Sequence, residues 1–186
     1  MRKNALVLTL FVLVLAGGLV LGAHPTAAEG TTLRLIAPGG TISGAGAFNV
    51  QVRVEGATNL GAYEFDVVYN PQVVALENAV PSNFLGATVN CNPNVARCVL
   101  TLGPLAPADG RKSVGAYTYG TGSGPSGNGT LVTLRFSPVS PGSSQIQLDK
   151  ALITDTAANP TIPATEGTAV TVGSASYHFW LPVLRH

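Results

Sequence analysis

The chain has 186 residues, which is enough for one domain with a substantial hydrophobic core. Charged residues make up 10% of the chain and the formal net charge is +1, so the sequence lacks the basic footprint of a nucleic-acid-binding protein. The 22 glycines and 13 prolines favour many short strands and turns over long helices.

Residues 1–28 have the plan of a secretory signal peptide. The start is basic, an apolar run covers residues 5–16, and small residues follow up to Ala28. We expect cleavage after Ala28 or Ala23, and therefore export to the medium or the cell surface. The alternative is an uncleaved membrane anchor, because the apolar stretch reaches Leu21.

Beyond the leader, apolar and polar residues alternate in short segments, as in β-strands with one buried face. Residues 47–56 carry apolar side chains at 48, 50, 52 and 54, and residues 129–138 carry them at 132, 134 and 136. Further strands are expected at 32–37, 61–69, 72–77, 84–90, 97–102, 113–120, 145–153 and 167–172, separated by Gly, Pro and Asn turn signals. Residues 31–173 are thus predicted to form one all-β domain, a two-sheet antiparallel β-sandwich of nine or ten strands.

The strand at 61–69 has two different faces. One face is aromatic and aliphatic and is expected in the core; it consists of Tyr63, Phe65, Val67 and Tyr69. The opposite face must meet water or a partner; it consists of Ala62, Glu64, Asp66 and Val68. Two carboxylates on an open face lack the apolar burial that raises the pKa of a glycosidase acid, so catalysis is disfavoured. A protein-contact surface is the preferred interpretation, and a solvated face is the alternative.

Cys91 and Cys98 are the only cysteines, and export permits a disulfide between them. The Asn-Pro-Asn between them is predicted to fold the chain back so that two strands present the thiols, and the short closed loop adds roughly 2–3 kcal/mol of stability. Histidines occur only at 24, 178 and 186, outside the predicted domain. A Ser-His-Asp or Cys-His catalytic site inside the domain is therefore excluded, and we expect no enzyme and no cofactor.

Three further motifs are weak. Residues 122–127 match G-x-G-x-x-G, but a strand follows instead of a helix, which favours a flexible loop in the segment 119–130. Asp155 is a weak calcium candidate, because the EF-hand spacing that it begins lacks the oxygen ligand and the glycine of that motif. Asn128-Gly129-Thr130 is a glycosylation sequon, but Asn-Gly is also typical of a tight hairpin, and we prefer the turn.

Residues 174–186 form a C-terminal tail that contains the only tryptophan, Trp180, followed by Leu181 and Pro182. The tail is too short to span a membrane and lacks the Leu-Pro-x-Thr-Gly pattern of a sortase substrate. It either docks on the domain, stays disordered, or acts as a sorting or surface-attachment signal. We favour the sorting or attachment interpretation.

The order of these segments resembles a cohesin module, the receptor half of the cohesin–dockerin pair that assembles cellulosomes. The run VRVEGATNLGAYEFDVVYNPQVVALENA is similar to the family's strand that ends in Tyr-Asp-Pro and is followed by a Val-Leu pair. GTLVTLRFSPV, SQIQLDKALITDTAANPTIP and GTAVTV then resemble the family's last strands in the same order. The similarity covers residues 32–172, and it depends on the order of these segments more than on any single motif.

This resemblance implies a nine-stranded sandwich with jelly-roll topology, of which one flat sheet face takes a dockerin helix of another secreted protein in extracellular polysaccharide breakdown. In the well-known cohesins an Asn and an Asp, two residues apart on this strand, hydrogen-bond that helix. The Asp position falls on Glu64, which keeps an acceptor, and the Asn position falls on Ala62, which does not. Asp66 is a candidate for the missing polar contact.

Two other functions remain open. The first is a carbohydrate-binding module on the same kind of sandwich, with Tyr117 and Tyr119 as a small sugar platform. The second is a structural or adhesive surface domain without a specific small ligand.

Overall fold

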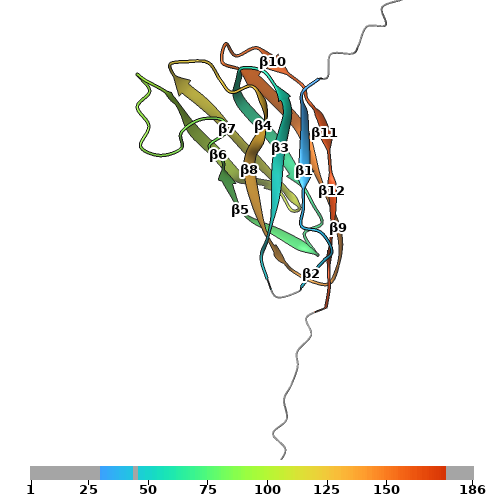
Figure 1. Ribbon diagram of the computed structural model, residues 1–186. Coiled ribbons are helices and arrows are strands. Elements are labelled where there is room, and N and C mark those ends of the chain that lie inside the picture. Colours follow the sequence, from blue (N-terminus) through green and yellow to red (C-terminus); the bar gives the residue numbers. More distant parts are fainter. Residues whose placement is uncertain (1–29, 44–45, 175–186) are drawn as a thin grey trace, which may run out of the picture.

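The computed structural model describes residues 30–43 and 46–174, and the described chain is all-β (Figure 1). The predicted signal peptide and the Trp180 tail lie outside the described residues. Within them the chain forms twelve strands. These are β1 (Thr32–Ile36), β2 (Thr41–Ile42), β3 (Phe48–Ala57), β4 (Leu60–Val68), β5 (Val74–Pro81), β6 (Arg97–Ala108), β7 (Arg111–Gly120), β8 (Gly127–Pro138), β9 (Gly142–Asp155), β10 (Pro160–Thr161), β11 (Ala164–Glu166) and β12 (Thr168–Val172).

The strands form two sheets that pack face to face as a sandwich (Figure 1). One sheet has the order β11-β1-β3-β8-β5, and the other has the order β2-β12-β9-β4-β7-β6, with the short β10 paired to β9. Most neighbours are antiparallel, and the pairs β1–β11 and β2–β12 are parallel. Nine of the strands have five or more residues, so the predicted β-sandwich is confirmed, with short parallel additions at its margins.

The core lies between the two sheets and is built from the inward half of each alternating strand. The apolar residues of β3 and β8 that were predicted to point inward are all 8% exposed or less, and so are the four inward residues predicted for residues 61–69. Phe136 stacks on Phe48, its cross-strand neighbour in the same sheet, at a centroid distance of 5.6 Å. Across the layers it meets Tyr69, which follows β4 of the other sheet, edge-on at 5.4 Å. This packing leaves the other side of β4 on the outside of the sandwich.

The predicted strand at 84–90 is wrong. After β5, the Phe84 N–H donates to the Ser82 hydroxyl, a local turn that ends the strand, and only Ala87 forms a bridge, to Cys98 of β6. Residues 82–96 are instead a long connection, which the Cys91–Cys98 disulfide closes. The pairing of the cysteines is confirmed, although Cys91 lies in this connection and not in a strand.

The Asn128-Gly129 turn is also wrong, because both residues lie inside β8. The Asn128 side chain accepts a hydrogen bond from the Gly56 N–H at 2.8 Å, and a Cβ at position 129 would overlap the ring of Phe84. Asn-Gly is therefore used here for a cross-strand contact and a close approach of a ring, and not for a tight turn.

The loop predicted at 119–130 is confirmed only for residues 121–126, because its two ends belong to β7 and β8, and hydrogen bonds fix this loop to the body of the domain. Asn59 accepts from the Gly124 N–H at 2.7 Å, and Pro125 O accepts from the Leu60 N–H at 2.9 Å. Across the described ranges, there is no helix of the length and apolar character needed to cross a membrane.

Candidate partner-binding face

The outward side of β4 lies in the middle of an open sheet face formed by β9, β4, β7 and β6. Strand register brings residues from all four strands into rows. Glu64 lies beside Leu152 of β9 and Gly115 of β7, and Gly115 lies beside Leu102 of β6. In the next row Ala62 lies beside Tyr117, and Tyr117 lies beside Leu100.

This face is unusually apolar for a surface. Leu100, Leu102 and Leu105 of β6 are 46%, 54% and 64% exposed, and Leu152 and Tyr117 are 37% and 41% exposed. We call it the leucine-rich face and define it by Ala62, Glu64, Leu100, Leu102, Leu105, Gly115, Tyr117 and Leu152. Contiguous exposed apolar side chains of this kind mark interaction surfaces.

Gly115 lies near the centre of the leucine-rich face and leaves it hollowed. A Cβ at this position would lie 3.1 Å from the carbonyl oxygen of Tyr63, so the site suits a residue without a side chain. Two hollows, of about 130 and 80 Å³, lie next to it, and both are lined by Glu64 and Leu102. Hollows of this size accept single apolar side chains of a partner.

Glu64 and Asp66 have different environments although they are neighbours on one strand face. Glu64 is exposed and makes no ion pair within the described chain. Asp66 is only 7% exposed, because Arg111, Ser113 and Lys150 cover it. The expectation that both acids meet water or a partner therefore holds for Glu64 and is corrected for Asp66.

The covered acid is part of an ion cluster on the chain's own surface. The Ser113 hydroxyl donates to Asp66 Oδ1 at 2.5 Å, and the Arg111 Nη1 group lies 2.8 Å from Asp66 Oδ2 and 2.7 Å from Asp149 Oδ2. The Ser113 hydrogen bond, together with the nearby cations of Arg111 and Lys150, lowers the pKa of Asp66 from its ordinary value. The Arg111 hydrogen bond likewise lowers the pKa of Asp149.

We expect the free energy of unfolding to fall as the pH drops below about 4. The pKa of Asp66 is lower in the folded chain than its ordinary value of 3.8, so the unfolded chain takes up the proton first. The stability from this carboxylate is therefore present above the ordinary pKa and is lost as the pH falls through the folded-state pKa. Urea denaturation between pH 2.5 and 6 measures the slope.

The Asp66→Asn variant is expected to show a shallower pH slope than the unaltered chain, because the titrating group is gone. Asp109→Asn, in the exposed connection between β6 and β7, serves as the control. Equal slopes in Asp66→Asn and the unaltered chain would contradict the assignment.

The remaining predicted site residues differ in exposure. Tyr117 and Tyr119 lie on the same side of β7, each 41% exposed, so the residues of the predicted sugar platform are accessible. Val68 is half-buried at the end of β4 beside Arg111.

Asp155, the weak calcium candidate, is not part of a group of metal-ligating side chains in the described part of the chain. Its carboxylate accepts hydrogen bonds from the N–H groups of Ala157 and Asn159 at 2.8 and 2.9 Å and from the Asn159 side chain at 2.7 Å. These bonds order its own loop. In the ranges 30–43 and 46–174, no three His, Cys, Asp or Glu side chains group as a metal site would require.

An open, apolar sheet face around one acid has the features of an interaction surface. The family model for the cohesin domain matches residues 39–172, most of the chain, so the chain belongs to the cohesin family. Members of this family are non-catalytic binding modules. A search of curated proteins found no match.

Solved structures share the fold at low sequence identity. A non-cellulosomal cohesin from the hyperthermophilic archaeon Archaeoglobus fulgidus is 19% identical at a TM-score of 0.55, covering 78% of this chain and 92% of that one. A cohesin module from a Clostridium perfringens family 33 glycoside hydrolase is 14% identical at 0.55, covering 78% and 98%. The cohesin of a type I cohesin–dockerin complex from Clostridium thermocellum is 14% identical at 0.55, covering 76% and 99%.

The exposed leucines of β6 were missed from the sequence. Along β6, Cys98, Leu100 and Leu102 alternate with Arg97, Val99 and Thr101, so the pattern favours burial of the side that carries the leucines. The structure buries Cys98 and Val99 and exposes Leu100 and Leu102, which no local signal identifies as surface contacts. Leu152 is similarly exposed on β9, which is separated from β6 by β4 and β7.

Proposed function

We propose that the protein is a non-catalytic receptor that docks a dockerin-type helical domain of another protein on the leucine-rich face. The observation that supports this most strongly is the hollowed row of exposed apolar side chains from Leu152 to Leu102, on a chain of the cohesin family. An amphipathic helix buries its apolar face in such a surface. Among the structural neighbours, the type I complex from Clostridium thermocellum pairs a cohesin with a dockerin.

Glu64 is the acceptor that orients the partner in this proposal. It is the one acid of the leucine-rich face, and the apolar residues around it exclude water once a helix covers them. A Lys, Arg, Ser or Thr of the helix then makes a charge-assisted hydrogen bond to it. Ala62 provides no polar contact, and Asp66 is held by Arg111 and Ser113, so Glu64 acts without the second polar residue of the well-known cohesins.

In this proposal, docking takes place outside the cell. Residues 1–28 have the sequence plan of a leader, and the disulfide of Cys91 and Cys98 suits an oxidising compartment. The partner is then a secreted, dockerin-bearing protein, and assembly of polysaccharide-degrading enzymes is the process that the family suggests. Residues 174–186 act in sorting or surface attachment.

Glu64→Gln is expected to weaken docking by about tenfold or more, because a hydrogen bond to a charged acceptor contributes about 1.5–3 kcal/mol. The test is calorimetric titration of the protein with dockerin domains encoded in the same genome. Glu77→Gln is the matched control: Glu77 is an exposed acid on β5 of the opposite sheet, and its contact with Arg135 is long, at 3.6 Å.

Unchanged affinity of Glu64→Gln for a dockerin that binds the unaltered protein would remove Glu64 from the interface. If no dockerin binds and the protein is retained on insoluble cellulose or chitin, the second candidate function, a carbohydrate-binding module, is favoured. In that case Tyr117 and Tyr119, both accessible on β7, are the sugar platform.

A further inference from the structure

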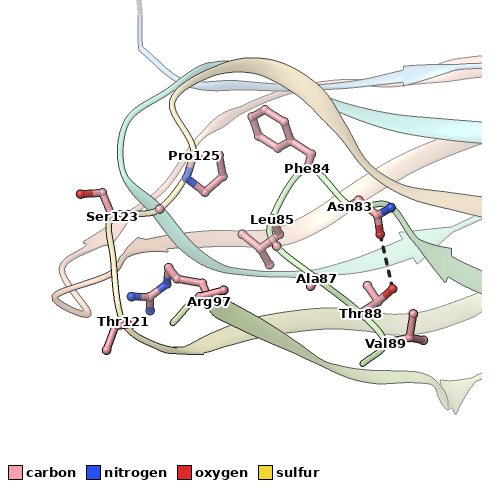
Figure 2. Close-up of a pocket in the computed structure, with 13 residues that line it drawn as sticks. Asn83, Phe84, Leu85, Ala87, Thr88, Val89, Arg97, Thr121, Ser123 and Pro125 are labelled. Atoms are coloured by element: carbon pink, nitrogen blue, oxygen red, sulfur yellow. Dashed lines mark hydrogen bonds between the residues drawn. The ribbon is translucent and has the colours of Figure 1, made fainter. Parts of the chain in front are cut away.

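A second concave site lies away from the leucine-rich face. It is a groove of about 670 Å³ between residues 83–89 and residues 121–125, where β6 begins (Figure 2). Its volume lies within the range of roughly 300–1,000 Å³ that is usual for small-ligand sites. Arg97, which lines it, is on the opposite side of β6 from Leu100 and Leu102, because successive side chains alternate.

Arg97 is the only ionisable side chain that lines the groove. Its guanidinium donates to Thr118 Oγ1 at 2.8 Å, to Gly122 O at 2.9 Å and, at 3.4 Å, to Thr118 O. All three acceptors are neutral, and two of the five guanidinium N–H groups remain. No carboxylate of the described residues lies within 4.0 Å of Arg97 or of Arg53, whereas Arg34 and Arg111 each have two and Arg135 has one. A half-buried cation without a counter-ion favours an anionic ligand.

The rest of the lining combines apolar surface with neutral polar groups. Phe84 and Pro125 lie on the side of the groove opposite Arg97 and Thr121 (Figure 2). The ring of Phe84 packs against Gly129, where a Cβ would overlap it, so its plane is fixed. Hydroxyl and amide groups around the rim come from Asn83, Thr88, Thr121 and Ser123.

Both walls of the groove are held in place before any ligand binds. The 83–89 wall is joined to β6 by the Ala87 bridge: the Val99 N–H donates to Ala87 O at 2.9 Å, and the disulfide closes the same connection. The opposite wall is fixed by Asn59 and by Arg97 itself. Preformed walls lower the entropy cost of binding.

We propose that this groove binds an acidic saccharide, a uronic-acid-bearing glycan segment, by its carboxylate at Arg97 and by its ring on Phe84 and Pro125. The sugar carboxylate accepts the two remaining guanidinium N–H groups, and the sugar hydroxyls bond to the Asn, Thr and Ser side chains at the rim. The apolar C–H face of the sugar ring covers the fixed aromatic plane. This site is independent of partner docking on the leucine-rich face.

The test is calorimetric titration of the protein with a galacturonic-acid tetramer, a neutral galactose tetramer and tetraglutamate. The acidic sugar is expected to bind at least about tenfold more tightly than the other two, and more weakly as salt is raised. Val89 is 74% exposed and lines the groove, so Val89→Asp places a like charge beside the ligand and is expected to weaken binding by at least about tenfold. Val95→Asp is the control, because Val95 is 77% exposed in the same connection but does not line the groove.

Three results would overturn the proposal. The first is an absence of uronate binding up to the solubility limit, and the second is equal affinity for the neutral sugar or for tetraglutamate. The third is an equal effect of Val89→Asp and Val95→Asp, which would place the ligand elsewhere. Dockerin binding is measured on the same samples, and its retention or loss does not bear on these outcomes.

Discussion

Replacement of Leu102 by aspartate is expected to weaken dockerin docking by about 100-fold or more while the fold is preserved. Leu102 is 54% exposed and lines both hollows of the leucine-rich face, so a bound helix covers it completely. Because Leu102 is about half exposed before docking, loss of its burial removes about 1 kcal/mol, roughly half the value for a fully exposed leucine. The new carboxylate is also desolvated next to Glu64, since both side chains line the same hollows across Gly115, and like charges in such a site repel.

Val80→Asp is the matched control for this experiment. Val80 is 51% exposed, close to the value for Leu102, but lies on β5 of the opposite sheet. The affinity of the Val80→Asp variant for the dockerin is expected to stay within about twofold of that of the unaltered protein. If Leu102→Asp and Val80→Asp bind alike, or if Leu102→Asp lowers the thermal midpoint by more than a few degrees, the loss does not report on an interface.

The β-sandwich could be predicted from the sequence because the alternation of apolar and polar residues involves neighbouring positions and recurs in strand after strand. Alternation along β3, β4 and β8 fixes which side chains enter the core, and a slip of one residue would expose every apolar side chain. The sequence therefore identifies the buried faces of these strands, and the structure confirms them. The connection at 82–96 was not predictable in this way, since its apolar residues Phe84 and Leu85 serve a loop that packs on the core instead of a strand.

The candidate site was only half predictable, because it depends on pairing between distant strands. Glu64 and Asp66 are equivalent along the sequence, and period-two alternation places both outside. Arg111 and Lys150, 45 and 84 positions after Asp66, decide that Asp66 is covered and Glu64 is open. The same holds for Leu102, whose place beside Gly115 and Glu64 follows from register and from no local signal. Composition excluded nucleic-acid binding, but only the assembled sheet locates a surface for a partner.

Phe136→Ala is expected to lower the free energy of unfolding by about 3–5 kcal/mol, the largest stability effect that we predict. Phe136 is fully buried in β8, and its ring contacts Phe48 and Tyr69 at centroid distances of 5.6 and 5.4 Å. Truncation removes the ring and leaves a cavity that neighbouring strands, fixed by hydrogen bonds, do not close. The loss is a large part of the roughly 5–15 kcal/mol of a typical domain.

The measurement is urea denaturation of Phe136→Ala beside Arg135→Ala. Arg135 is the adjacent residue of β8, its side chain is 58% exposed, and its ion pair with Glu77 is 3.6 Å long, so its removal is expected to change stability by about 0.5 kcal/mol or less. A loss below about 1 kcal/mol in Phe136→Ala would contradict the packing between the two sheets. Because Phe136 lies in the opposite sheet from Glu64, the folded fraction of Phe136→Ala is expected to keep its affinity for a dockerin, which separates the core's contribution to stability from that of the leucine-rich face to binding.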